Sequence, residues 1–254
     1  MDDVQKGILI DLVDSSLDRA EKIWSKEGHM MESINVTVEG MDSLDIVKRA
    51  ELVPSYIPGS PIVSTDIDKV DTFVALVADM RDSTKHLMCR IATSRDNVTE
   101  LKRVFYETSA LLPALAQTIK FENGSVTEYL GDGILALFKL EDDKKAIYDA
   151  RRAAVNCLTV TRQIVNEAIS KRYSLPGLDL GVGLATSQAL VTTVGLSGEM
   201  HAKAFGKCIF NATKKSNGRN KIFVDKDLEA IWPTSKGGFT FKKIDDYFEL
   251  PYNK

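Results

Sequence analysis

The sequence contains few cysteines and few histidines, and this scarcity argues against proteins built around disulfides or zinc sites. Three cysteines and three histidines are spread over 254 residues without a CxxC pair, so we expect reduced thiols and no zinc site built from them. No apolar run reaches the roughly 18 residues of a transmembrane helix. With 44% hydrophobic and 27% charged residues, the composition is typical of a folded globular chain.

Positive and negative charges are nearly balanced. The 33 lysines and arginines stand against 36 aspartates and glutamates, which gives a formal net charge of −3. Nucleic-acid-binding proteins usually present a basic face, so we expect no nucleic-acid partner. The segment 1–6 is acidic where a secretory signal is basic, so we expect a cytoplasmic protein that does not act at a membrane.

Helical and strand-like patterns alternate along the chain. Helical periodicity over about 1–28 and a proline-rich stretch at 53–61 predict an N-terminal helix and extended connector over 1–69. A compact domain is expected over 70–254. Its predicted strands lie at about 72–78, 125–130, 134–138, 178–185 and 189–194, its helices at about 83–119, 142–171 and 209–216, and a hairpin at about 238–250.

The order of these elements is strand, helix, strand, strand, helix, strand, which predicts a ferredoxin-like βαββαβ fold of the α+β class. Asp79 closes the first strand and Asp132 lies at the tip of the central hairpin. These two elements are neighbours in such a sheet, so both carboxylates are expected at one sheet edge. Paired carboxylates suit Mg²⁺ or Mn²⁺. A simpler interpretation stays open, in which Asp82 or Ser83 caps a helix and the hairpin aspartate only makes a turn.

Four segments, in order, resemble the motifs of the class III nucleotidyl cyclases over roughly residues 70–250. They are 77–84 (VADMRDST), 128–138 (EYLGDGILALF), 180–186 (LGVGLAT) and 204–211 (AFGKCIFN). The resemblance implies the cyclase fold with an N-terminal helical extension and two Mg²⁺ or Mn²⁺ ions per site. It also implies a homodimer with shared sites, in which one chain supplies the aspartates and the other the remaining groups.

The resemblance assigns roles to individual residues. Asp79 and Asp132 would hold the metal ions, with the backbone carbonyl of Met80 as a further ligand. Asn211 would position the ribose. Lys215 stands where the family usually has an arginine that stabilises the transition state, and it keeps the charge without the planar fork.

The resemblance also assigns base-reading positions, to Glu128 and to either Lys203 or Ala204. Adenylyl cyclases usually carry lysine at the first of these. Glutamate accepts hydrogen bonds and suits the ring N–H of uracil or guanine, or the amino group of cytosine. Lys203 would donate to a carbonyl oxygen. An interpretation of Glu128 as an exposed strand residue stays open, and Arg81 contacts either a phosphate or only its own turn.

The sequence departs from the family pattern at several positions. Gly181 stands where arginine is frequent, and residues 185–187 (Ala-Thr-Ser) replace a His-Thr-Gly. Asn211 lies one residue farther from Gly206 than is usual. The phosphate-binding lysine has no clean match, and the lysines at 242–243 are the candidates. These departures argue against a generic adenylyl cyclase.

The compact domain, the turn at 79–84 and the proline-rich lead-in are similar to the pyrimidine cyclases of bacterial Pycsar antiphage systems. That resemblance implies conversion of UTP, or CTP, to the 3′,5′-cyclic monophosphate and pyrophosphate, with the product read by a separate effector. Two alternatives stay open. One is a guanylate or adenylate cyclase in bacterial signalling. The other is a non-catalytic module, either an inactive regulator or an RNA-binding domain, whose sheet would need stacking aromatics that the predicted central strands lack.

Overall fold

The computed structural model describes residues 1–31, 51–88, 98–233 and 240–252. The helical elements are α1 (Asp3–Met31), α2 (Ser83–Met88), α3 (Glu100–Phe121), α4 (Lys145–Asn156), the π-helical turn η2 (Cys157–Thr161), α5 (Arg162–Tyr173), α6 (Lys207–Lys215) and α7 (Lys226–Ala230). The strands are β1 (Leu52–Pro54), β2 (Ile62–Ser64), β3 (Lys69–Met80), β4 (Ser125–Tyr129), β5 (Gly133–Lys139), β6 (Leu180–Leu196), β7 (Glu199–Gly206), β8 (Lys221–Asp225), β9 (Lys242–Ile244) and β10 (Tyr247–Glu249).

The main sheet has the strand order β4-β5-β3-β6-β8-β10-β9, and β7 pairs with β6. The central strand β3 pairs antiparallel with β5 on one side and with β6 on the other. Along the chain, β3, α3, β4, β5, α4–α5 and β6 follow in the predicted order, so the ferredoxin-like βαββαβ prediction is confirmed. The strand β8 then extends the sheet by pairing parallel to β6.

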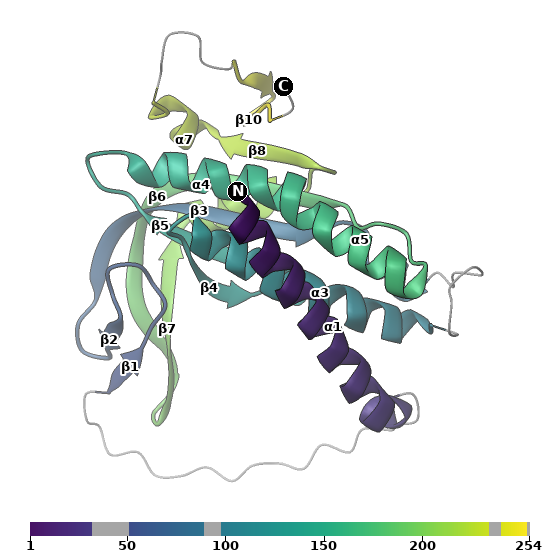
Figure 1. Cartoon of the computed structure of the whole chain (residues 1–254). Helices are drawn as coiled ribbons and strands as arrows, with labels where there is room; N and C mark the ends of the chain where they lie inside the picture. The colour runs from purple at the N-terminus through teal and green to yellow at the C-terminus, as the bar shows by residue number, and fades with distance from the viewer. Residues whose placement is uncertain (32–50, 89–97, 234–239, 253–254) are drawn as a thin grey trace.

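Both faces of the central strand are buried, which explains why its sequence is a continuous apolar run. Successive side chains of β3 alternate between two hydrophobic clusters. Helices α1, α3, α4 and α5 lie together over one face (Figure 1). On the other face, α6 and β7 contribute Cys208, Ala212 and Ala204 to the second cluster.

The N-terminal helix packs into the same core as the sheet. Its buried residues Leu9, Val13, Leu17 and Ala20 recur at helical spacing and belong to the first cluster. None of the helices in the described ranges is both long enough and apolar enough to cross a bilayer. Residues 51–67 carry the small β1–β2 sheet, while residues 32–50 of the predicted connector lie outside the described ranges.

The predicted strand pair at 178–185 and 189–194 was wrong, because residues 180–196 form the single strand β6. The polar residues at 186–188 suggested a turn. However, β3 is 12 residues long and stays paired with β6 over its whole length. The hydroxyl of Thr186 donates to the Phe73 carbonyl at 2.9 Å, which satisfies this buried polar group without a turn. The true partner of the second half of β6 is β7, which the sequence patterns did not predict.

The single helix predicted over 83–119 was also wrong in extent. The short helix α2 ends at Met88, residues 89–97 lie outside the described ranges, and α3 begins at Glu100. Thr99 caps α3 by accepting a hydrogen bond from the Lys102 amide at 3.3 Å. The hairpin predicted at 238–250 corresponds to β9 and β10, and its residues 238–239 lie outside the described ranges.

Candidate active site

The two aspartates come together at one end of the central strand pair. Asp79 lies next to the last residue of β3 and is paired in register with Gly133, directly after Asp132. The Met80 amide donates to the Asp132 carbonyl at 3.1 Å, which holds the hairpin tip against the strand end. A Cβ on Gly133 would lie 2.8 Å from Asp79 Oδ1, so only glycine allows this approach. The tight hairpin therefore places the two acidic residues side by side.

The electrostatics of this pair favour a cation. Burial, and after it repulsion from the neighbouring Asp132 carboxylate, raise the pKa of Asp79 to about 6, although the positive charge of Arg81 opposes the shift. Two hard carboxylate oxygens held together fit Mg²⁺ or Mn²⁺. Within the described ranges, no group of three or more His, Cys, Asp or Glu side chains is placed to hold a metal ion. A metal at this pair would therefore depend on backbone, water or phosphate oxygens for its other ligands.

The side chains beside the pair are already engaged. The Met80 side chain is buried in the core, so only its backbone is available at the site. Arg81 Nη1 donates to Asp79 Oδ2 at 3.0 Å and to the Ser216 carbonyl at 3.3 Å. Arg81 thus contacts both the candidate metal ligand and the end of α6.

The two base-reading candidates meet in space. Lys203 Nζ, from β7, donates to Glu128 Oε2, from β4, at 2.9 Å. Glu128 pairs in register with Leu135, and Leu135 pairs with Val77. Opposite residues share a sheet face, so Glu128 lies on the same face as Val77 and as Asp79, two residues along β3. Glu128 and the metal candidate therefore lie on one face of the sheet, and Lys203 reaches Glu128 from β7.

Positions 203 and 204, the two candidates for the second base-reading residue, differ in burial. Ala204 belongs to the second hydrophobic cluster and is 6% exposed. The Lys203 side chain is 37% exposed and reaches Glu128. Of the two positions, Lys203 is therefore the one whose side chain contacts Glu128.

Asn211 and Lys215 lie one helical turn apart on α6, and both bond to aspartates on the β8–β10 side of the sheet. Asn211 Nδ2 donates to Asp225 Oδ2 at 3.0 Å. Lys215 Nζ lies 3.2 Å from Asp246 Oδ1 and 4.0 Å from the centre of the Tyr247 ring. Among the described contacts, neither side chain touches Asp79 or Asp132 of the same chain.

Glycines on β6 allow α6 to lie against the sheet. A Cβ at Gly181 would come within 1.9 Å of the Ser216 carbonyl oxygen, and one at Gly183 within 2.0 Å of the Ala212 carbonyl oxygen. Gly181 stands at the position where the cyclases often carry arginine. In this chain, an arginine there would displace the C-terminal end of α6.

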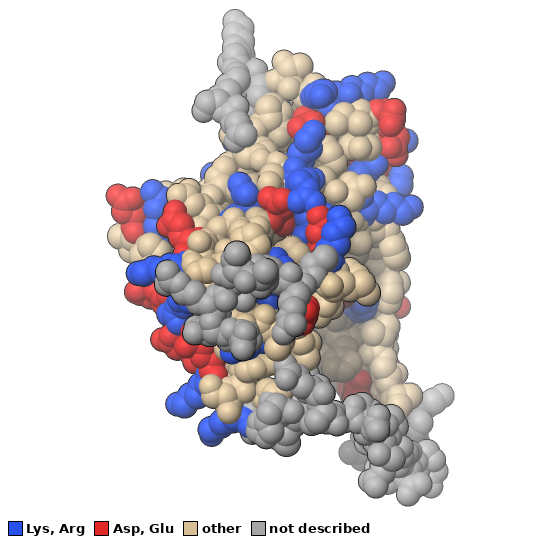
Figure 2. Space-filling view, turned by 90° about the vertical axis from the view of Figure 1, so that its right-hand side faces the viewer, with Lys and Arg blue, Asp and Glu red and all other residues tan. Residues whose placement is uncertain are grey.

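An ion-pair network next to the aspartates was not predicted. Arg219 pairs with Asp82 after β3 and with Asp179 before β6, and the Asp179 carbonyl accepts from the Arg81 amide at 2.8 Å. No motif marks Arg219, because its partners are distant in sequence. The lysine candidates at 242–243 lie exposed on β9. Basic and acidic side chains are interspersed on the described part of the face in Figure 2.

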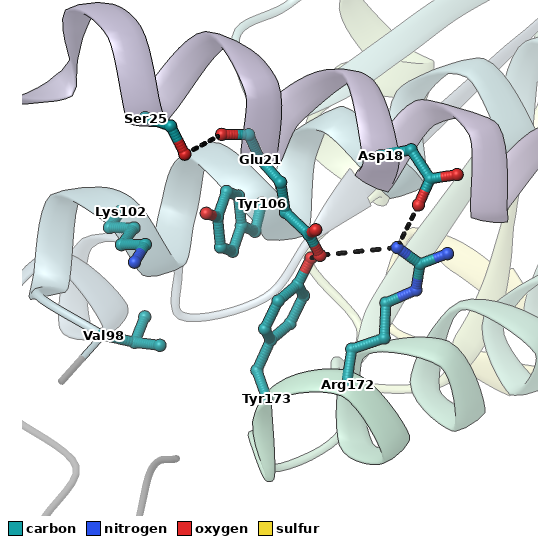
Figure 3. Close-up of a pocket in the computed structure, with 8 residues that line it drawn as sticks. All are labelled: Asp18, Glu21, Ser25, Val98, Lys102, Tyr106, Arg172 and Tyr173. Atoms are coloured by element: carbon teal, nitrogen blue, oxygen red, sulfur yellow. Dashed lines mark hydrogen bonds and ion pairs between the residues drawn. The ribbon is translucent and has the colours of Figure 1, made fainter. Parts of the chain in front are cut away.

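A separate hollow lies between α1, α3 and α5 (Figure 3). Its volume is about 570 Å³, and none of the predicted site residues lines it. Arg172 pairs there with Asp18 at 2.5 Å and with Glu21 at 3.4 Å, and the Tyr173 hydroxyl donates to Glu21. Tyr173 also stacks on Tyr106 with ring centres 4.6 Å apart. These groups bind each other, and they attach α1 to the domain.

No protein-family model and no curated protein matches the sequence. Solved structures do match the fold. The guanylyl cyclase Cya2 is 18% identical, with 71% of this chain and 92% of that chain covered and a TM-score of 0.57. The adenylyl cyclase CyaB from P. aeruginosa is 12% identical, with 74% and 98% covered and a TM-score of 0.56. The chain has the class III nucleotidyl cyclase fold.

The cyclase fold is shared by a protein that is not described as a cyclase. A class III adenylyl cyclase-like ATP-binding protein from Pseudomonas aeruginosa is 18% identical, with 65% of this chain and 35% of that chain covered and a TM-score of 0.55. At these identities the likeness establishes the fold alone. The activity depends on the side chains at the site, which are the carboxylate pair, the Glu128–Lys203 pair and those of α6.

Proposed function

We propose that this chain is a homodimeric nucleotidyl cyclase that converts a pyrimidine nucleoside triphosphate, UTP in preference to CTP, to the 3′,5′-cyclic monophosphate and pyrophosphate. The observation that carries the proposal is the pairing of Asp79 and Asp132 at one strand end of a cyclase fold. Both acidic residues that such a reaction needs are present and adjacent.

In the proposed reaction the ribose 3′-hydroxyl gives up its proton to solvent, and its oxygen attacks the α-phosphorus. A new oxygen–phosphorus bond closes the ring, and the bond to the β-phosphate oxygen breaks in line, so that pyrophosphate leaves. Two Mg²⁺ or Mn²⁺ ions held by Asp79 and Asp132 would supply charge neutralisation of the attacking and leaving oxygens. The chain's own residues contribute chiefly by binding and orienting the nucleotide.

The Glu128–Lys203 pair supports a base with an N–H beside a carbonyl. Glu128 can accept from the ring N–H of uracil, and Lys203 can donate to the neighbouring carbonyl oxygen. Adenine presents the reverse order, an unprotonated ring nitrogen beside an amino group. Glu128 would then face an acceptor and Lys203 a donor, which leaves polar groups unpaired and costs binding free energy. Guanine presents the same N–H and carbonyl edge, so a guanylate cyclase is the second candidate.

The position of α6 supports a dimer. Asn211 and Lys215 bond to Asp225 and Asp246 and, among the described contacts, do not touch Asp79 or Asp132 of their own chain. A complete site would combine the aspartates of one protomer with the α6 residues of its partner. A two-fold axis would then generate two such sites. The role in antiphage defence and the separate effector rest on the resemblance to Pycsar cyclases, and the cytoplasmic location rests on the acidic segment 1–6.

Product analysis tests the substrate. The purified chain is incubated with Mn²⁺ and each of the four nucleoside triphosphates, and the products are identified by mass spectrometry. We expect cyclic UMP as the main product and cyclic CMP next. Cyclic GMP would establish the second candidate, and dominant cyclic AMP would remove the pyrimidine proposal. Nucleotide binding without any cyclic product would establish a non-catalytic regulator.

The metal assignment has its own test. Asp79→Ala and Asp132→Ala should each lower turnover more than about 100-fold, because the charge neutralisation at the reacting phosphate is lost. Circular dichroism should show the fold intact. Asp142→Ala, an exposed acidic residue beyond the other end of β5, is the matched control and should keep full turnover. Activity retained in both aspartate variants would contradict the assignment.

A further inference from the structure

Arg81 lies between two negative groups. Its Nη1 donates to the Asp79 carboxylate at 3.0 Å and to the carbonyl oxygen of Ser216 at 3.3 Å. Both charged side chains are about one quarter exposed, at 27% for Arg81 and 26% for Asp79. A partly desolvated pair of this kind is screened less than a surface pair.

The guanidinium of Arg81 is incompletely satisfied. Arginine carries five N–H donors, and in the described part of the chain only Nη1 has hydrogen-bond partners. The backbone is nevertheless fixed, because the Arg81 amide donates to the Asp179 carbonyl at 2.8 Å. The side chain can therefore change partners without moving the strand end.

The second partner of Arg81 is the end of α6. Ser216 directly follows Lys215, the last residue of that helix, and is 4% exposed. A carbonyl at a helix C-terminus carries partial negative charge and favours a nearby cation. The close approach of Ser216 to Gly181 brings this carbonyl within reach of Arg81.

We propose that Arg81 is a positioning residue: it is the counter-ion that holds Asp79 before metal and nucleotide bind, and it releases Asp79 when they bind. This inference rests on the proposed function. On release, Arg81 also gives up the Ser216 carbonyl, which loosens the C-terminal turn of α6. In the proposed dimer, α6 contributes Asn211 and Lys215 to the second site. Arg81 therefore links the metal-binding aspartates of one site to the α6 residues of the other site.

Mn²⁺ binding without nucleotide tests the counter-ion role. Replacing Arg81 with glutamine removes a competing positive charge 3.0 Å from Asp79, so Mn²⁺ should bind about tenfold more tightly in an electron paramagnetic resonance titration. Arg81→Lys keeps the charge and should bind Mn²⁺ as the wild type does. Arg219→Gln makes the same charge change beside Asp82 and Asp179 and should leave the affinity nearly unchanged. Unchanged or weaker binding by the Arg81→Gln variant overturns the proposal.

Hydrogen exchange tests the link to α6. In the wild type, adding Mn²⁺ and a non-reacting UTP analogue should speed exchange of the amides at 213–216, because the bond to Arg81 is lost. In the Arg81→Gln variant the same amides should already exchange fast, and adding Mn²⁺ and the analogue should not change their exchange rates. If the exchange rates at 213–216 of the wild type do not change, the proposed coupling of Arg81 to α6 is contradicted, because a purely local role for Arg81 would leave α6 unaffected.

Asp79→Asn separates this inference from the proposed function. If Asp79→Asn binds Mn²⁺ as tightly as the wild type, the metal assignment fails, and the proposed function loses its support. If Asp79→Asn binds weakly but Arg81→Gln gains no affinity, only the counter-ion inference fails.

Discussion

Glu128 and Lys203 are 75 positions apart in the sequence and 2.9 Å apart in space. Each is about one third exposed, so the pair is reachable by a ligand and is not part of the core. An ion pair of this exposure contributes little to stability. The pair matters instead for binding. Glu128 lies on the same sheet face as Asp79, and a base bound there would meet one hydrogen-bond acceptor, Glu128, and one donor, Lys203.

Exchanging these two residues tests base reading directly. The double variant Glu128→Lys/Lys203→Glu keeps an ion pair but reverses the order of donor and acceptor. We expect the ratio of kcat/KM values for UTP and ATP to fall by about 100-fold, because UTP would now leave both groups unpaired. Rates are measured for all four nucleotides.

The single variants serve as controls for that exchange. Glu128→Lys and Lys203→Glu each place like charges together, so both should lower kcat/KM for every nucleotide. A double variant that keeps the wild-type preference would show that the pair does not read the base.

Among the elements, the position of α6 depends on two glycines of the neighbouring strand β6. Its carbonyls lie so close to β6 that only glycine fits at Gly181 and Gly183. The helix carries Asn211 and Lys215, and its end is bonded to Arg81. A shift of α6 would therefore disturb both the proposed transition-state groups and the counter-ion of Asp79.

Gly183→Ala should lower the free energy of unfolding by roughly 2–3 kcal/mol, because the new methyl group would displace the backbone of α6. Urea denaturation measures the change. Gly7→Ala is the control on α1, where a Cβ meets nothing within 4 Å, and it should raise stability by up to about 1 kcal/mol. A Gly183→Ala variant as stable as the wild type would contradict the close-packing argument.

The elements also show where sequence patterns succeed and fail. The Asp-Gly hairpin between β4 and β5 was predicted because turn type and alternation are local properties. The single strand β6 was not, because its polar middle at 186–188 is satisfied by the neighbouring strand β3 rather than by a turn. The partner strand β7 was missed for a related reason, since its residues are mostly half-exposed and lack a clear apolar pattern.

At the scale of the whole molecule, β6 and β7 form a hairpin that extends beyond the sheet (Figure 1). Glu51 holds its tip, because Glu51 Oε1 accepts from Ser197 Oγ and from the Gly198 amide at 2.8 Å each. Exposed apolar side chains on the hairpin include Leu190, Val194, Leu196 and Phe205. Such a surface is typical of an interface and suits the second copy that the proposed shared site would require.

Mixing inactive variants tests the shared sites of the dimer. Asp79→Asn should inactivate one half of a site, and Asn211→Ala/Lys215→Ala the other half. Equal mixing after dissociation should restore about a quarter of wild-type activity, because half of the dimers are then mixed and each has one intact site.

The matched control combines two variants of the same half. A mixture of Asp79→Asn and Asp132→Asn leaves no intact site in any dimer and should remain inactive. Rescue in this control, or no rescue in the first mixture, would contradict a site shared between protomers.

The sequence by itself determined the order of strands and helices and the aspartates at two turns, because apolar periodicity and turn chemistry act over a few neighbouring residues. Only the tertiary structure decided that Lys203 and not Ala204 faces Glu128, and that Arg81 joins Asp79 to the end of α6. Those contacts join residues 75 and 135 positions apart. They depend on how β7 and α6 lie against the sheet, which packing of the whole chain sets and no local pattern encodes.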